Sequence, residues 1–576
     1  MSLLLSALID TGAASGGSSA PDTRTYKKWQ DFYGESMQTV VGTQLVTEIP
    51  QSQRSIDGTA QNRRVGSSGV AWTVPSGVTK IRVTCLGGGG GGGRRGSSYY
   101  GSSGGGGGAF STAEYTVTAG ETLNVRPGRS GAGYCRQFGS SSSNDGYDGT
   151  SSYVYGSGAL SQNEINIEAD YGRGGPQQGG NGGSKGEANN STTSGSRLVG
   201  GSSDKQDGGI GGQGNQNAIG WGPEGYAGGG GGSCGFKGSQ GTRGGNAGNS
   251  YGYSWTGCGG GGIGGRGGNG EGSRTASDYY SWSGAGGGTG GSTPIGGDGV
   301  HNDSNPPSSS HEIEGGTASY SPCPAGGYND QYASGNSVSE GLGMSSASGN
   351  PSPHEQFPNG KGTWKRGCGA NFGDGEETGG AGGGGGTGSS LTSWSPYEQK
   401  FGIASSSGGG SALKGWAAGA TSTVIGAAMS GDMYNGVLGR LQSGGGASVP
   451  CKAQNGGQSM NATACPGGSG AGGSGASGFT SQMAPWKDKN ETMEWVPAQM
   501  SFRLKQSIFD DDDQMNKGGN GGCGGALGGG GSSCNYGIAG HGGIGAGGGG
   551  AGGHYQGSSY NGSGGDGGPG YILIEW

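Results

Sequence analysis

The chain has 576 residues, and 155 of them are glycine. That share is about 27 %, roughly four times the usual share of about 7 %. Hydrophobic residues make up 28 % of the chain and charged residues 13 %, so side chains are too few for ordinary hydrophobic cores along its whole length. Collagen is excluded because it needs glycine at every third position with abundant proline, whereas this chain has long glycine runs and 20 prolines.

Charge and hydropathy exclude further classes of protein. The formal net charge is −7, from 33 basic and 40 acidic residues, with no basic block. We therefore expect no nucleic-acid partner. The apolar stretch at residues 3–9 has no basic residue before it and is far shorter than the roughly 20 residues that span a bilayer. Neither a signal peptide nor membrane insertion is expected.

Ten cysteines are spread along the chain without CxxC pairs, a distribution that argues against zinc. Two interpretations of these residues stay open. They can form disulfides, or they can be small buried thiols packed among glycines in a protein assembled in a reducing cytoplasm. The buried thiols are the preferred interpretation.

Residues 1–68 contain few glycines and are expected to form a small mixed N-terminal segment. The aromatic residues of 26–33 have a spacing that would line one face of a helix. Residues 39–41 and 44–49 have the composition of strands. A short module before a low-complexity body is typical of an attachment segment, and it equally suits a small cap on the next domain.

From residue 72 the pattern changes to that of β-strands. Residues 72–86 contain a Pro-Ser-Gly turn and then alternate, which places Ile81, Val83 and Cys85 on one face. Residues 109–118 and 121–127 alternate on either side of an Ala-Gly turn. This pattern predicts a β-hairpin.

Further strands are expected at 152–155 and 165–169 and at the C-terminal residues 570–576. The last of these has only glycine tracts near it in the sequence, so its pairing partner must come from far away in the chain. The fold class is therefore mostly β and irregular. A β-sandwich frame, with strands near 72–127 and 570–576, would comprise residues 69–170 plus 565–576.

The frame would enclose residues 171–564, in which glycine tracts repeat with a period of three. The tracts lie at 208–213, 261–270, 379–383, 466–474 and 518–525. A period of three matches an extended helix with three residues per turn, so these residues are predicted to form a polyglycine II bundle. Bare backbone ridges allow neighbouring helices to hydrogen-bond to one another. Disorder is the alternative that composition favours, but the sustained period and the Ile, Cys and Ala at third positions argue against it.

Aromatic and polar residues gather in the connections between the tracts. If the tracts are antiparallel, these connections meet at the ends of the block and form an array that resembles a binding paratope. For any single aromatic residue, the alternative is that it caps or covers the bundle. The receptor-binding candidates are Tyr99, Tyr100, Tyr251, Tyr253, Trp255, Tyr279, Tyr280, Trp282, Trp394 and Tyr397.

No catalytic residue or cofactor can be assigned from the sequence, and we expect a protein that is not an enzyme. None of the five histidines has the spacing of a ligand set, and the GxSxG and HExxH motifs are absent. No pair of carboxylates typical of a glycosidase stands out. The run Asp510, Asp511, Asp512 and Asp513 is a weak candidate for a divalent cation. A solvated acidic loop is the preferred interpretation of that run, so no metal is expected.

Two family resemblances follow from these motifs. Residues 72–93, 104–110 and 564–576 resemble the opening and closing motifs of the glycine-rich domain of bacteriophage tail and virion structural proteins. The tracts from about 170 to 570 resemble the glycine-rich tip adhesin of T-even-type phage long tail fibres. In that family, polyglycine II helices carry loops that touch host receptors. Long interruptions depart from the pattern and leave the number of helices open.

The resemblances imply a virion protein of a tail fibre or tail tip, assembled in the host cytoplasm and acting outside the cell. Its loops would bind a host surface glycan or an outer-membrane protein, and residues 1–68 would contact other virion proteins. Copies of the chain could also form a homo-oligomer. The alternative is a structural virion or filament component whose glycine-rich faces pack copies or neighbouring subunits together.

Overall fold

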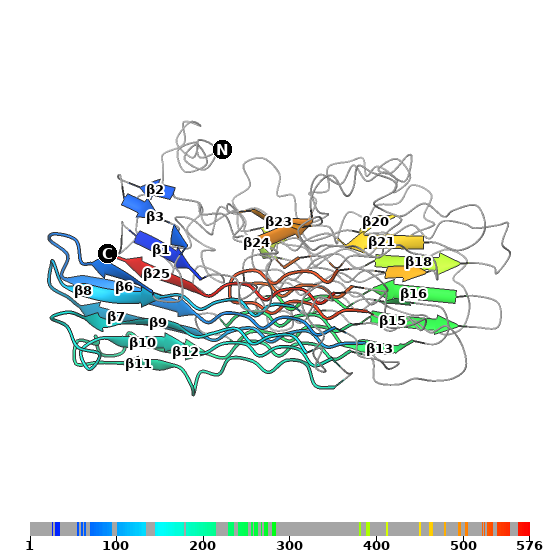
Figure 1. Cartoon of the computed structure of the whole chain (residues 1–576), viewed down its shortest axis with the longest axis horizontal. Helices are drawn as coiled ribbons and strands as arrows, with labels where there is room; N and C mark the ends of the chain where they lie inside the picture. The colour runs from blue at the N-terminus through cyan, green and yellow to red at the C-terminus, as the bar shows by residue number, and fades with distance from the viewer. Residues whose placement is uncertain are drawn as a thin grey trace, which may run out of the picture.

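The computed structural model describes most of the N-terminal third of the chain, parts of the middle and the C-terminal residues. Every regular element in the described residues is a β-strand, and no helix occurs among them. Figure 1 shows extended segments that run from a group of strands toward the other end of an elongated block. Apart from short strands given below, the described residues are 26, 29–34, 69–94, 101–133, 145–177, 180–214, 228–235, 240–250, 258–262, 267, 521, 523–524, 527–533, 538–552 and 563–576.

The largest sheet has six strands in the order β12-β7-β6-β25-β1-β4. All of its pairs are antiparallel except β1 with β4. The C-terminal strand β25 therefore lies between β6 and β1, which come from the N-terminal part of the chain. The strands are β1 Trp29–Tyr33, β4 Arg63–Arg64, β6 Lys80–Leu86, β7 Phe110–Thr116, β12 Asp204–Gln206 and β25 Tyr571–Glu575.

The second sheet has five antiparallel strands in the order β11-β10-β9-β8-β5. Most strands of the two sheets coincide with the alternating stretches of the sequence, whose prediction as strands is confirmed. Strands β11 and β12 lie beyond residue 170, so the chain returns to both sheets after that point. The strands are β5 Val70–Thr73, β8 Thr122–Arg126, β9 Ser152–Ser157, β10 Asn166–Ala169 and β11 Thr192–Ser194.

The predicted hairpin of residues 109–127 is wrong. Strand β7 pairs with β6, whereas β8 pairs with β5 and β9, so the turn at Gly120 carries the chain from one sheet to the other. Gly120 has a φ of 87°, which favours glycine. Alternation of apolar and polar residues is expected on any strand with one buried face, so it cannot distinguish a hairpin from a connection between two sheets.

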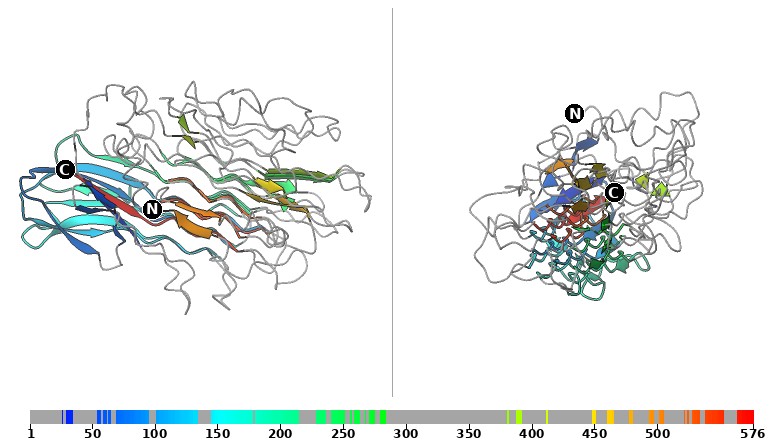
Figure 2. Two further views of the ribbon diagram at one scale, coloured as in Figure 1. Left: turned by 90° about the horizontal axis from the view of Figure 1, so that it is seen from above. Right: turned by 90° about the vertical axis from the view of Figure 1, so that its right-hand side faces the viewer.

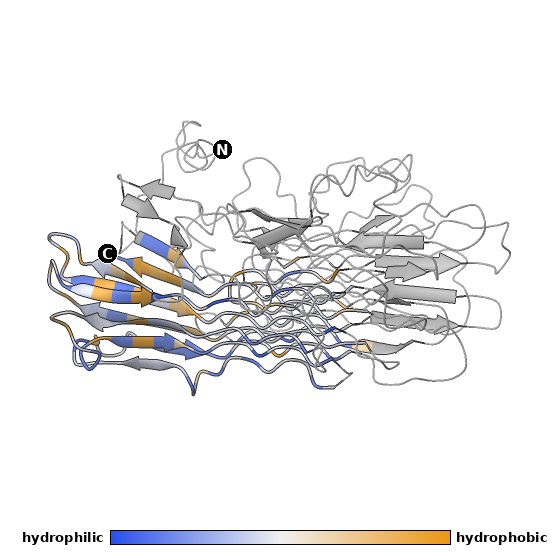
Figure 3. Cartoon of the chain, viewed as in Figure 1, coloured by the Kyte–Doolittle hydropathy of each residue, from blue (hydrophilic) through white to orange (hydrophobic). Residues whose placement is uncertain are grey.

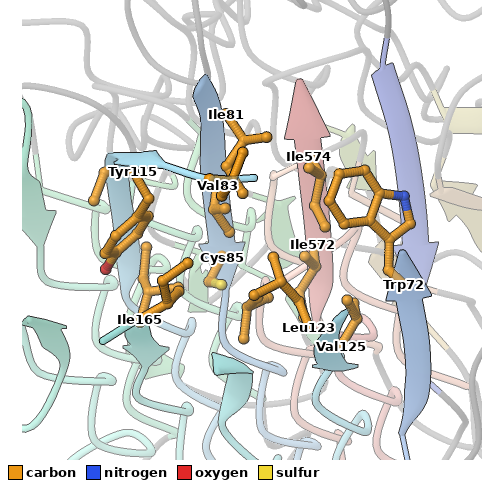
Figure 4. Packing of buried hydrophobic residues seen from close by; sticks show 14 of the residues in the cluster. Trp72, Ile81, Val83, Cys85, Tyr115, Leu123, Val125, Ile165, Ile572 and Ile574 are labelled. Carbon is orange, nitrogen blue, oxygen red and sulfur yellow. The ribbon is translucent and has the colours of Figure 1, made fainter. Parts of the chain in front are cut away.

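One hydrophobic cluster contains residues of both sheets (Figure 4). Ile81, Val83 and Cys85 of β6 are fully buried in it, as the alternation predicts. They are joined by residues such as Leu123 of β8 and Ile572 of β25. In Figure 3 the largest stretches coloured as hydrophobic residues lie in the strands, whereas most of the glycine-rich segments have intermediate hydropathy.

Residues 26–33, whose aromatic spacing suggests a helical face, contain strand β1 instead, so this prediction is wrong. Phe32 of β1 joins the hydrophobic cluster, while Tyr33 packs against Tyr571 on β25 with ring centroids 5.1 Å apart. Short apolar runs fit helix and strand alike. Here the backbone of β25 supplies hydrogen-bond partners along β1, and this pairing stabilises a strand instead of a helix. Residues 39–41 and 44–49 lie outside the described residues.

Other short strands form separate sheets. One has the order β13-β15-β16-β18 and another β14-β22-β21-β20. Their labelled strands lie at the end of the block opposite β6–β10 (Figure 1). The strands are β2 Arg54–Ile56, β3 Thr59–Gln61, β13 Ala247–Ser250, β14 Trp255–Thr256, β15 Gly270–Arg274, β16 Tyr279–Ser283, β17 Gly380–Ala381, β18 Thr387–Leu391, β19 Ser411–Ala412, β20 Ser448–Pro450, β21 Met460–Ala464, β22 Ser477–Phe479, β23 Met493–Val496 and β24 Ser501–Leu504.

Candidate functional site

Extended glycine-rich segments continue several strands of the two large sheets and form what we call the glycine block. Residues 87–93 follow β6, residues 104–109 precede β7, and residues 564–570 precede β25. Figure 2 shows that such segments run side by side along the long axis. The block also contains described parts of the expected tracts at 208–213, 261–270 and 518–525, whereas the tract at 466–474 lies outside the described residues.

Within residues 87–93, every third N–H donates to the same neighbouring segment. Consecutive residues therefore bond in three different directions, whereas a strand in a sheet bonds in two. All three of these neighbours run antiparallel to 87–93. The bonds, of 2.8 to 3.0 Å, run from Gly89 and Gly92 to Gly568 and Gly565, from Gly90 and Gly93 to Gly106 and Ser103, and from Gly88 and Gly91 to Thr150 and Tyr147.

The carbonyl groups of the same segment accept hydrogen bonds from three further directions. Two of these neighbours, 172–175 and 548–551, run parallel to residues 87–93, and the third bond comes from Gly131. The segment thus has six hydrogen-bonded neighbours. Every N–H group and most carbonyl groups of residues 87–93 have backbone partners, so hydrogen bonds hold this segment in place although it has no side chains of its own.

Glycine in the block is required by close packing. A Cβ added to Gly90 would lie within 3.0 Å of the carbonyl oxygen of Arg173, and one added to Gly92 would approach Gly549 as closely. Real Cβ atoms do not come so near to backbone oxygen. Neither glycine has a positive φ, so neighbouring backbone, not an unusual conformation, excludes other residues here.

Residues at third positions differ between the outside and the inside of the block. In the outer segment 208–214 the glycines are buried, while Ile210 is 42 % exposed. Inner segments bury their side chains completely, small ones as well as larger ones such as Ile544, and Cys234 and Cys523 are fully buried. Among the described cysteines, Cys85, Cys234, Cys258 and Cys523 are buried and form no disulfide, so the buried-thiol interpretation is confirmed for these four. Burial raises the pKa of Cys523 to about 12, which keeps its thiol protonated.

At the surface of the block, side-chain carboxylates accept hydrogen bonds from backbone N–H groups, a role that neighbouring backbone carbonyls have in the interior. The N–H of Gly174 donates to Asp148 Oδ1 at 2.8 Å, and the N–H of Gln177 donates to Asp145 Oδ1 at 2.6 Å. Asp145 and Asp148 are three residues apart, as are their two partners. The period of the block therefore continues into its side-chain contacts.

Inside the block, the side chains of His541 and Asp566 also accept hydrogen bonds from backbone N–H groups. The N–H of Asp566 donates to His541 Nδ1 at 2.7 Å, and Asp566 Oδ1 accepts from the N–H of Gly133 at 2.7 Å. Both side chains are buried. Sequence reasoning missed these four polar residues, although a single polar residue at a third position of a glycine tract is a visible signal.

Four of the ten receptor-binding candidates lie in described strands. Trp255 belongs to β14, and Tyr279, Tyr280 and Trp282 belong to β16. Strand β16 pairs with β15 and β18 at the end of the block far from the two large sheets (Figure 1). The other candidates lie outside the described residues; they are Tyr99, Tyr100, Tyr251, Tyr253, Trp394 and Tyr397.

The weak metal candidates Asp510–Asp513 also lie outside the described residues. Among the residues that are described, no three His, Cys, Asp or Glu side chains are grouped as metal ligands. A search of that same part of the chain finds no helix with the length and hydropathy to span a membrane.

A comparison with known families adds one finding. Residues 64–299 match the glycine-rich domain family. The matched stretch, less than half of the chain, contains strands β5–β12 of the two large sheets and the segments 87–93 and 104–109. It does not include β25, although β25 pairs with β6 inside it. No curated protein matches the chain.

Proposed function

We propose that this protein is a bacteriophage virion protein of the tail fibre or tail tip. In this proposal it binds host-cell surface receptors through loops displayed by the glycine block. The observation that carries the proposal is the period-three network of hydrogen bonds, which joins the two large sheets to segments that run toward the far end. A glycine-rich scaffold of this kind is the feature for which the chain resembles phage adhesins.

The proposal includes a finer description of the scaffold. Its segments would be polyglycine II helices, for which the period of three, the six neighbours of 87–93 and the glycines that exclude a Cβ are the support. The two large sheets would form a β-sandwich, because one hydrophobic cluster takes residues from both. At about 3.1 Å per residue, the seven residues 87–93 would span about 22 Å.

The mechanism would be preorganisation. Segments bonded in six directions leave little freedom to the loops that they carry, so little conformational entropy is lost when a loop meets its receptor. Several copies on one particle would add avidity to weak single contacts. The receptor would be a surface glycan or an outer-membrane protein, and the protein would act outside the cell without catalysing a reaction.

Residues 1–68 would contact other virion proteins in this proposal. Strand β1 is part of that segment, but it is buried between β25 and β4. The contact would therefore be made by other residues of the segment, with β1 anchoring them to the sheet.

Replacement of two aromatic segments, one of them in strand β16, on assembled particles tests the proposal. Residues 251–255 and 279–282 are replaced by Gly-Ser sequences of equal length, and adsorption to host cells is measured. We expect adsorption to fall because the aromatic contacts are lost. The matched control is the same replacement at the turn around Gly158, where an added Cβ would meet nothing within 4 Å. Unchanged adsorption of the loop variant would contradict the proposal.

Electron microscopy separates the proposal from a packing role. With gold-labelled antibody against residues 251–282, label at a fibre or tail tip supports the adhesin. Label along a shaft or on the capsid, together with oligomers that grow with concentration, would support a structural component instead.

A further inference from the structure

The five-stranded sheet presents a second surface whose residues have no role in the function proposed above. Its inner face supplies Val125, Val154 and Ile167 to the hydrophobic cluster. Side chains alternate along a strand, so Tyr153 and Tyr155 of β9 lie on the opposite, outer face. Both tyrosines are partly exposed. This surface, which we call the tyrosine face, belongs entirely to described residues.

Strand register places polar side chains on both sides of each tyrosine. Tyr153 lies between Arg126 of β8 and Glu168 of β10. Residues in register on neighbouring antiparallel strands have Cβ atoms about 4.5 to 5.5 Å apart. The first row of the tyrosine face therefore consists of a cation, an aromatic ring and a carboxylate.

The second row repeats this arrangement with neutral groups. Tyr155 lies between Asn124 of β8 and Asn166 of β10. The two tyrosines are two residues apart on one strand, so their Cα atoms are separated by about 6.6 to 6.8 Å. The two rows therefore form a compact patch of two rings with hydrogen-bonding groups along both sides.

Hydrogen bonds fix the position of one ring. The Tyr153 hydroxyl interacts with the side chains of Ser151 and Glu168. These contacts limit the positions that the ring can take, and Tyr153 stays partly exposed on the outer face. A tyrosine hydroxyl is protonated at neutral pH, and burial raises the pKa of Tyr153 further above that range, so the hydroxyl keeps its donor. A ring held in this way loses little entropy when a ligand covers it.

We propose that the tyrosine face binds a chain of neutral hexoses. One side of a pyranose ring presents C–H groups that pack on an aromatic ring, while its hydroxyl groups extend around the rim and both donate and accept hydrogen bonds. Arg126 would donate to such hydroxyls, Glu168 would accept from them, and the amide of Asn166 can do both. Two rings on one strand would stack on successive sugars.

Charge favours this ligand over others. The charges of Arg126 and Glu168 cancel, so the patch lacks the cluster of cations that a phosphate backbone or an acidic polysaccharide requires. The polar residues on both sides of the rings also limit the apolar area, whereas a docked protein would prefer a larger apolar patch. A neutral polyol matches both the charge and the mixed donors and acceptors.

Affinity electrophoresis of the full chain tests the proposal. Native gels contain dextran, hydroxyethylcellulose or soluble starch, and dissociation constants follow from the loss of mobility. We expect at least one of these neutral polysaccharides to retard the protein. Tyr155→Ala should raise the dissociation constant at least about tenfold, or about 1.4 kcal/mol, while Tyr155→Phe, which keeps the ring, should retain most of the affinity.

Controls separate lost stacking from lost folding. Thr73→Ala changes an exposed residue of the edge strand β5 in the same sheet and should leave mobility unchanged. Thermal unfolding confirms that each variant is folded. The proposal is overturned if none of the neutral gels retards the protein, if only an acidic polysaccharide such as polygalacturonate does, or if Tyr155→Ala binds as the wild type does.

The outcome is independent of the receptor-binding proposal. The tyrosine face lies on the large sheets, at the end of the block opposite β16 (Figure 1). Replacing residues 279–282 should therefore leave polysaccharide retardation intact. Conversely, Tyr155→Ala would weaken retardation even if residues 251–255 and 279–282 prove to have no part in adsorption.

Discussion

The imidazole of His541 accepts a hydrogen bond from the backbone N–H of Asp566, at 2.7 Å, in the buried interior of the glycine block. Because Nδ1 accepts this bond, it carries no proton. The Asp566 carboxylate in turn accepts from the N–H of Gly133. Two side chains thus complete a backbone network at a place where three segments meet.

This relationship predicts the effect of removing the acceptor. In His541→Leu the N–H of Asp566 would stay buried without its partner, and we expect the free energy of unfolding to fall by about 1 to 3 kcal/mol. Denaturation in urea, followed by circular dichroism, measures the change. His541→Gln is the informative control, because its amide oxygen can accept the bond and should recover part of the loss. Equal stability of all three proteins would contradict the assignment.

Close packing of the glycines makes a second prediction. In Gly90→Ala the new Cβ would meet the carbonyl oxygen of Arg173, so the segments must separate and their hydrogen bonds lengthen. Overpacking of this kind typically costs about 1 to 3 kcal/mol, and we expect at least that loss. Gly200→Ala is a matched control, since its Cβ meets nothing within 4 Å and its φ is not positive. It should change stability by less than about 1 kcal/mol. Urea midpoints of the two variants provide the comparison.

The strands of the fold could be predicted because alternation is a local property of the sequence, as Ile81, Val83 and Cys85 illustrate. The strands with which each of them pairs could not be predicted in the same way. The turn at Gly120 joins two sheets because β8 meets β5 and β9, and these contacts depend on residues far away in the sequence. Residues 26–33 form a strand for the same reason, since β1 is stabilised by the C-terminal strand.

The glycine block shows a second limit of sequence reasoning. The period of three predicted that glycine segments would pack against one another, but bare backbone carries no information about which segment lies next to which. That information lies in the sparse polar residues such as Asp148, His541 and Asp566, each of which accepts from the N–H of one particular residue or segment. Three of the receptor-binding candidates proved to lie in one strand, β16, which the sequence had suggested only as a connection.

Acidification should weaken the six-stranded sheet through Glu114. Burial alone would raise the pKa of this carboxyl, but hydrogen bonds from Lys80, Tyr26 and Arg82 outweigh burial and hold the pKa below its ordinary value of 4.5. A lowered pKa stabilises the fold above pH 4.5, and this contribution is lost as the pH falls through 4.5 toward the folded-state pKa.

Glu114→Gln provides the measurement for this pH dependence. At pH 7 we expect the variant to be about 1 to 3 kcal/mol less stable than the wild type, because charged hydrogen bonds are lost. The difference should shrink as the pH falls below 4.5. Urea titrations at pH 7, 5 and 3.5 give the three differences. A difference that stays constant over this range would exclude Glu114 as the titrating group.

Thiol chemistry gives a further prediction. Burial raises the pKa of the Cys85, Cys234 and Cys523 thiols, so the thiolate that reacts with alkylating agents is scarce and shielded. In native protein at pH 8, iodoacetamide should leave these cysteines unmodified. After unfolding in urea, all three should be alkylated. Peptide mass spectrometry reads each site separately, and modification of any of them in the native state would show that the segment opens in solution.

The surface of the glycine block makes the last prediction. Asp148 accepts from the N–H of Gly174, whereas the next N–H, that of Gly175, donates to the carbonyl of Gly91 inside the block. In Asp148→Ala the first bond is lost and the second is kept. Amide hydrogen exchange at Gly174 should accelerate about three- to tenfold, which corresponds to the net 0.5 to 1.5 kcal/mol of one hydrogen bond. Gly175 serves as the internal control, and Asp148→Asn, which keeps an acceptor oxygen, should exchange more nearly like the wild type. If Gly174 and Gly175 accelerated together in Asp148→Ala, the carboxylate would be holding the whole segment in place, and its role would extend beyond accepting one bond at the surface.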